Sequence, residues 1–158
     1  IRNLYPGDYG GNMDTSLIKE GSILFLPVFQ DGAYLGCGDL HAAMGDGEAF
    51  YEGIECAGEV QLTIKVRKDL DMDIPYVIAD GKFASIGTDE TIEKALRKSM
   101  SKLLHFLSGQ LPSLSVTDIS YILGFYGNLE ISQVVDPLMT GRMSISMDIL
   151  KKIGLEII

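Results

Sequence analysis

Cysteine is scarce in this sequence, which has only Cys37 and Cys56 among its 158 residues. Two cysteines so far apart cannot supply a disulfide framework or a cysteine-rich metal site, so we expect a reducing, cytoplasmic location. No apolar run approaches the roughly 20 residues that a membrane-spanning helix needs. The best candidate, residues 23–29, is too short and contains Pro27. The sequence shows no signal peptide, and we expect no membrane partner.

Basic residues are also in short supply, with 13 Lys and Arg against 22 Asp and Glu, and the net charge is −9. Nucleic-acid binding depends on basic side chains that displace counterions from phosphates. This balance therefore argues against a nucleic-acid partner.

The length of the sequence suits a single folded domain, and we expect residues 1–158 to form one. Hydrophobic residues make up 46% of the chain, which is enough for a buried core. The first residue is Ile1 rather than methionine, and a turn-rich stretch follows at residues 5–12. We therefore expect the sequence to be a piece of a longer protein.

The first half of the sequence has the patterns of β-strands. Residues 60–67 alternate between apolar and polar side chains, which predicts a half-buried strand. Asp31-Gly32 and Asp80-Gly81 each suit a tight hairpin turn, because glycine accepts a positive φ. The expected strands around these two turns are 22–30, 33–40, 74–79 and 82–86.

The second half of the sequence changes to a helical period. Apolar residues three and four apart predict a helix over residues 88–108, capped by Thr88 or Asp89 and ended by Gly109. A second helix is expected over residues 116–126, and closing strands over 129–135 and 142–147. This order predicts an α+β fold, with a β-sandwich or barrel-like portion and a two-helix excursion between its strands.

Residues 36–48 concentrate acidic groups and one of the two histidines in a glycine-rich loop. Asp39 and His41 are two positions apart, so they face the same side of an extended segment. Carboxylate and imidazole groups together are usual zinc ligands. A polar turn with a hydrogen-bonded histidine would have the same pattern, so spacing alone leaves both interpretations open. The loop matches neither a phosphate-binding P-loop nor a calcium-binding EF-hand.

This loop, GDLHAAMGDGE at residues 38–48, resembles a signature of the acetamidase/formamidase family, written G-D-x-H-A-x-Q-G-D-G-E. One departure is Met44, which stands where the family commonly has glutamine. Three further segments resemble elements of the same family in the same order: GGNMDT at 10–15, IE at 54–55 and LEISQVV at 129–135. Since the family's proteins are about twice as long, the resemblance implies that this chain is their carboxy-terminal half.

The resemblance implies hydrolysis of short linear amides, such as formamide and acetamide, to a carboxylate and ammonia. We expect a divalent metal to assist the reaction, with zinc favoured over calcium. The hypothesis for the metal ligands is Asp14, Asp39 and His41. The candidates for proton transfer are Glu48 and Glu55, while Asp46 could play either part. The expected partners are the amino-terminal half of the same protein, the amide substrate and further copies of the subunit.

Two other functions fit parts of the sequence. Cys37 lies four residues before His41, so a Cys-dependent hydrolase is one alternative. A non-catalytic β-sandwich binding module with structural calcium is another, and Asp69, Asp71 and Asp73 could supply its acidic ligands. We interpret Asn12 as a turn residue and His105 as structural.

Overall fold

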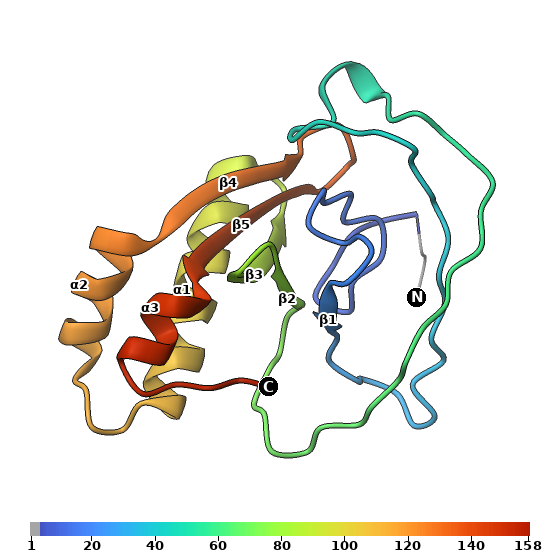
Figure 1. Cartoon of the computed structure of the whole chain (residues 1–158). Coiled ribbons are helices and arrows are strands. Elements are labelled where there is room, and N and C mark those ends of the chain that lie inside the picture. The colour runs from blue at the N-terminus through green and yellow to red at the C-terminus, as the bar shows by residue number, and fades with distance from the viewer. Residues whose placement is uncertain (1–3) are drawn as a thin grey trace.

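The computed structural model describes residues 4–158, so the opening Ile1 lies outside the described residues. One five-stranded antiparallel sheet forms its centre, with strands in the order β1-β2-β3-β5-β4 (Figure 1). The strands are β1 (Ile23–Phe25), β2 (Tyr76–Ala79), β3 (Lys82–Asp89), β4 (Asn128–Gln133) and β5 (Met139–Ser146). The helices are α1 (Ile92–Gln110), α2 (Val116–Tyr126) and α3 (Met147–Lys152), with a 3-10 turn η1 (Ala49–Tyr51).

The α+β class is confirmed, and α1 with α2 forms the expected two-helix excursion between strands β3 and β4. In the described part of the chain the strands form a single sheet rather than two facing sheets. Helix α2 begins and ends where its pattern predicts, with Ser115 and Asp118 as a reciprocal capping box. None of the helices in the described residues is long and apolar enough to cross a membrane.

The hairpin between β2 and β3 confirms the prediction made from Asp80-Gly81. Both residues have positive φ angles, 51° and 70°, as a two-residue turn between twisted strands requires. All four residues of β2 are buried, and alternate side chains enter two separate clusters. Tyr76 and Ile78 face the helices, whereas Val77 and Ala79 face the segment that contains Met13 and Leu17. The sheet is thus covered on both faces, by helices on one and by the amino-terminal segment on the other.

Helix α1 packs directly on strand β3, and Thr91 caps it, not Thr88 or Asp89. Thr88 and Asp89 instead complete β3, which runs three residues further than predicted. The closest approach is at Gly87, where an added Cβ would lie 2.4 Å from the backbone oxygen of Ala95. A side chain larger than hydrogen at this position would push the helix off the sheet.

Replacement of Gly87 with alanine is expected to destabilise the chain by about 1–3 kcal/mol, because the new methyl group meets backbone rather than a movable side chain. Gly109, inside α1, is the matched control, since nothing lies within 4 Å of a Cβ added there. Gly109→Ala should stabilise the chain by up to about 1 kcal/mol. Urea denaturation of both variants measures whether each substitution raises or lowers the free energy of unfolding. Destabilisation by both substitutions would contradict this packing.

Two predicted strands in the first half are wrong. Residues 33–40 and 60–67 belong to no strand, and nearly all of their side chains are exposed. Asp31-Gly32 forms a turn, closed by a hydrogen bond from the Ala33 N–H to the Gln30 carbonyl, but its flanks do not pair. Within residues 22–30 only Ile23–Phe25 forms a strand. The reason is that the described part of the chain offers these segments no neighbouring strand, and a strand forms only with a partner.

Candidate functional site

The acidic loop folds back on the residues that follow it. The N–H groups of Ala42 and Cys56 donate to Ile54 and Leu40 carbonyls at 2.7 and 2.9 Å, and the Ile54 N–H donates to Ala43. This short ladder pairs His41 with Glu55 across the two segments. The His41 ring lies over Gly53, where an added Cβ would come within 2.5 Å of Nδ1. These backbone hydrogen bonds therefore fix the position of His41, although the loop around it is not part of the sheet.

The end of the loop is attached to strand β4. The Gly47 N–H donates to the Ser132 carbonyl at 2.8 Å, and the Val134 N–H donates to the Gly47 carbonyl at 3.2 Å. The loop is thus held at a sheet edge formed by residues about 85 positions away in the sequence. These hydrogen bonds place the segment 129–135, which resembles an element of the family, against the loop.

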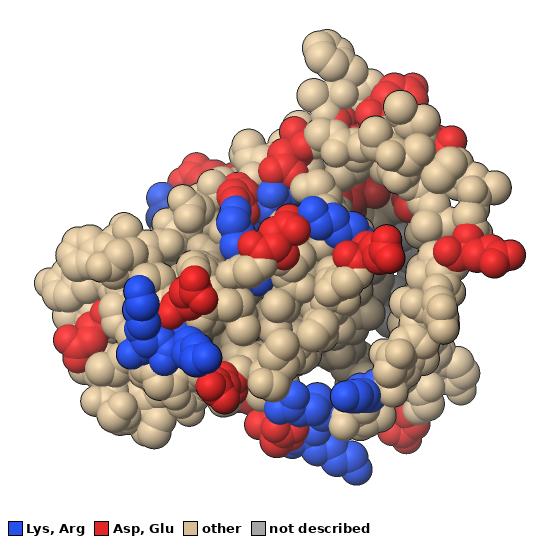
Figure 2. Space-filling view, viewed as in Figure 1, with Lys and Arg blue, Asp and Glu red and all other residues tan. Residues whose placement is uncertain are grey.

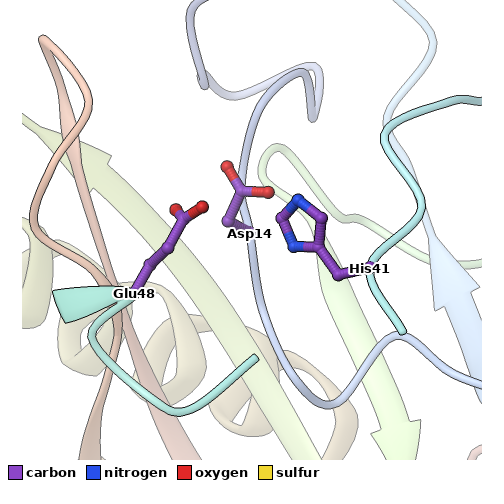
Figure 3. A group of neighbouring side chains, drawn as sticks. All are labelled: Asp14, His41 and Glu48. Atoms are coloured by element: carbon purple, nitrogen blue, oxygen red, sulfur yellow. The ribbon is translucent and has the colours of Figure 1, made fainter. Parts of the chain in front are cut away.

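Asp14 lies beside this loop, and its side chain and those of two loop residues, His41 and Glu48, point toward one another (Figure 3). One potential ligand atom of each lies within 4.8 Å of the others. A second group, Asp39, His41 and Glu55, meets the same criterion and shares the imidazole. His41 Nε2 lies 2.8 Å from a Glu55 oxygen and 3.5 Å from an Asp39 oxygen. The expected ligands Asp14 and Asp39 both lie beside His41, in different groups.

Three of the residues that carry these carboxylates have a backbone conformation that residues other than glycine rarely adopt. Asp14, Asp39 and Glu48 have φ angles of 37°, 62° and 44°. For residues other than glycine this region costs energy, and such costs concentrate at functional sites. The strain is maintained because the surrounding ladder and strand contacts fix the loop.

The cluster has more acidic than basic groups, and the pKa values of its residues are shifted as a result. Burial, followed by the charges of Glu48, Asp39 and Asp136, raises the pKa of Asp14 to about 7, although His41 opposes the shift. Burial also raises the pKa of Glu48, a residue with only 8% exposure. Burial alone would lower the pKa of His41, but the neighbouring Glu55 and Asp39 raise it. A cation would relieve this repulsion, so the donor set fits a divalent metal.

Sequence reasoning missed Asp136, which joins the cluster from the turn between β4 and β5. Its carboxyl group hydrogen-bonds to that of Asp14 and accepts a hydrogen bond from Asn12 Nδ2 at 2.9 Å. Burial raises the pKa of Asp136, although its hydrogen bonds with Asn12 and Asp14 oppose the shift. The residue is followed by proline, and the sequence indicated only a turn. Asn12, interpreted as a turn residue, positions the added carboxylate.

Asp46 lies outside both groups of potential ligands. Its carboxylate accepts hydrogen bonds from Ser16 Oγ and from Arg142 Nη2. Burial opposes the effect, but these contacts hold the pKa of Asp46 below its usual range. The Arg142 side chain is 3% exposed, and its Nε also donates to Glu130 at 3.0 Å. Asp46 therefore anchors the loop to β5 rather than facing the cluster.

The remaining candidates are engaged elsewhere or lie apart. Asp69 pairs with Arg67 at 2.6 Å, and Asp73 pairs with Lys102, so two of the three alternating acids form ion pairs. Cys37 is a free, exposed thiol. His105 is exposed on α1.

Comparison with known proteins connects this site to a family. A model of the Acetamidase/Formamidase family matches residues 1–106. A putative formamidase of Schizosaccharomyces pombe is 45% identical over 80 residues, which are 46% of this chain and 20% of that protein.

Solved structures match over nearly the whole chain. A recombinant predicted acetamidase/formamidase from Thermoanaerobacter tengcongensis superimposes with a TM-score of 0.94 at 42% identity, covering 99% of this chain and 52% of that one. An acetamidase from Bacillus halodurans gives 0.93 at 40% identity, over 98% and 52% of the two chains. The chain thus spans about half the length of these structures. It belongs to the acetamidase/formamidase family.

Proposed function

We propose that this chain carries the metal-binding and proton-transfer residues of an amidohydrolase that cleaves short linear amides, with formamide and acetamide as the leading substrates. The products would be a carboxylate and ammonia. One observation carries the proposal: in a chain of this family, Asp14 converges with two residues of the acidic loop, His41 and Glu48. The names of the relatives support the substrate class.

Zinc is the metal that the donor set favours. Each candidate group combines one imidazole nitrogen with two carboxylates, whereas calcium prefers oxygen ligands alone. His41 would hold the ion with Asp14 from one group and with Asp39 from the other, which leaves Glu48 and Glu55 free for other roles. Bound zinc would supply Lewis acidity, which polarises an amide carbonyl and makes water a stronger acid.

Glu48 is the better candidate for proton transfer. Hydrolysis requires a group that takes a proton from water and gives one to the leaving nitrogen, because an unprotonated amide anion leaves poorly. Burial raises the pKa of Glu48, which makes its carboxylate a stronger base than an exposed one. Glu55 is more exposed, with 66% of its side chain accessible, and it hydrogen-bonds to His41. We assign Glu55 to orienting the imidazole.

The proposal predicts that amide hydrolysis requires both a metal and Glu48. Because the chain spans half of its relatives, the assay should use it joined to the remaining half of the Thermoanaerobacter tengcongensis relative. Ammonia release from formamide should stop when a chelator removes the metal and return when zinc is added. Glu48→Gln should lower kcat by about 100-fold or more, with KM changed far less.

Glu52→Gln is the matched control, since Glu52 is an exposed acid four residues away, outside both candidate groups. It should leave kcat unchanged. Activity that survives the chelator but not thiol alkylation would favour a Cys-dependent hydrolase and overturn the proposal. Bound calcium without any ammonia release would identify a binding module instead.

A further inference from the structure

Residues 60–67 have the sequence of a strand but lie outside the sheet. Val60, Leu62, Ile64 and Val66 alternate with polar residues, yet their exposed fractions are 46%, 52%, 69% and 79%. Every residue from 54 to 69 is exposed. Four apolar side chains at strand spacing on one segment form a surface that soluble domains normally cover.

Both ends of this segment are attached to the rest of the molecule. Just before it, the Cys56 N–H donates to the Leu40 carbonyl at 2.9 Å. At its far end, Arg67 Nη1 donates to the Ile157 carbonyl at 3.3 Å, and the same guanidinium binds Asp69. Between these attachments the chain runs as the green arc on the right of Figure 1. The corresponding rim in Figure 2 is mostly uncharged and stands apart from the body.

We propose that the 60–67 segment becomes a β-strand by pairing with a strand from the half of the family polypeptide that this chain does not include. The two solved relatives are about twice as long, since this chain covers 52% of each. Pairing would satisfy the backbone N–H and C=O groups of the segment. Its four apolar side chains would form the buried face, leaving Gln61, Thr63, Lys65 and Arg67 on the solvated face.

The segment also leads directly out of the candidate site. It begins five residues after Glu55, whose side chain is 66% exposed, and the side chain of Asp39 is 45% exposed. A strand added along 60–67 would therefore adjoin the part of the chain that carries Glu55. The inference does not depend on the hydrolytic reaction, because its test measures association and not turnover.

Hydrogen exchange with a defined partner tests the pairing. The probe is the half of the Thermoanaerobacter tengcongensis relative that this chain does not match, produced separately and added to the intact chain. Alternate amides within 60–67 should exchange at least about tenfold more slowly in the mixture than in the chain alone. Unchanged exchange throughout the segment would overturn the proposal. Protection that rises with the concentration of this chain alone would also overturn it, since a second copy would then be the occupant.

A pair of substitutions separates the two faces of the segment. Ile64→Asp places a charge on the expected buried face and should weaken association by at least about tenfold. Thr63→Asp places the same charge on the opposite face and should change association by less than about threefold. Both side chains are exposed in the chain alone, so neither substitution should lower its own unfolding midpoint. Equal effects of the two variants on association would contradict the assigned face.

Discussion

Replacement of His41 with alanine should remove both metal binding and amide hydrolysis, because both candidate ligand groups include this imidazole. Loss of the nitrogen leaves only carboxylates, and burial together with the neighbouring acidic charges already raises the pKa of Asp14 to about 7. Zinc affinity should fall by at least about 100-fold, the upper range for loss of a residue that merely supports a ligand. Isothermal titration of zinc into the metal-free chain measures the affinity. Ammonia release from formamide by the joined polypeptide measures the turnover.

The second histidine of the sequence provides the matched control. His105 is exposed on helix α1, and it belongs to neither candidate group. His105→Ala should therefore leave zinc affinity and turnover unchanged. Full activity in the His41→Ala protein would remove the central residue from the proposed site. Loss of zinc from both variants would indicate a general folding defect instead, which circular dichroism of each protein would reveal.

The elements that the sequence predicted well are those whose signals lie in neighbouring residues. Helix α2 has its cap, its apolar face and its terminating Gly127 within 13 residues. The β2–β3 hairpin follows from Asp80-Gly81 and the apolar runs that flank it. Each of these signals acts through local backbone conformation and hydrogen bonding. They need no information about the rest of the fold.

The failures occurred where a partner distant in the sequence decides the structure. Residues 60–67 alternate as a half-buried strand does, but alternation cannot show whether a neighbouring strand is present. Helix α3 was missed, and the expected closing strand at 142–147 ends at Ser146, which caps that helix. The strand propensity of a single segment is therefore weaker evidence for its structure than a local helix cap or turn.

For the candidate site, too, the sequence predicted some residues well and missed contacts between distant ones. Composition and resemblance pointed to His41 and its acidic neighbours, and the structure brings Asp14, Asp39, Glu48 and Glu55 around it. Asp136 was missed because it lies 122 residues from Asp14 in the sequence, in a turn without a distinctive pattern. The sequence also gave no sign of the contact between Asp46 and Arg142.

Replacement of Arg142 with methionine is the second large effect that we expect, and its cause is structural. Arg142 is almost fully buried, and it joins Asp46 on the acidic loop to Glu130 on β4. It also donates to Thr15, Ser132 and the Ile131 carbonyl. Methionine keeps much of the packing volume but leaves the buried acceptors without their cation. The free energy of unfolding should fall by about 3 kcal/mol, as for other buried pairs that lose one partner.

The same substitution should weaken zinc binding, because it releases the loop that carries Asp39 and His41. Loss of a residue that holds a ligand segment typically lowers metal affinity by about tenfold or more. Arg97→Met is the matched control, since Arg97 forms an exposed ion pair with Glu93 on helix α1. It should leave both the unfolding free energy and the zinc affinity unchanged. Urea denaturation and zinc titration of the two variants measure these effects.

Measurements of stability at acid pH distinguish loss of the ion pair between Arg142 and Glu130 from loss of packing alone. Burial opposes the effect, but hydrogen bonds from Lys82 and Arg142 hold the pKa of Glu130 below its ordinary value of 4.5. A carboxylate with a lowered pKa stabilises the fold above that ordinary value, and its contribution disappears as the pH falls through the folded-state pKa. The wild-type chain should therefore lose stability on acidification below pH 4.5, and the Arg142→Met variant should lose less. Equal losses in the two proteins would show that the packing of Arg142, and not its charge, attaches the acidic loop to the sheet.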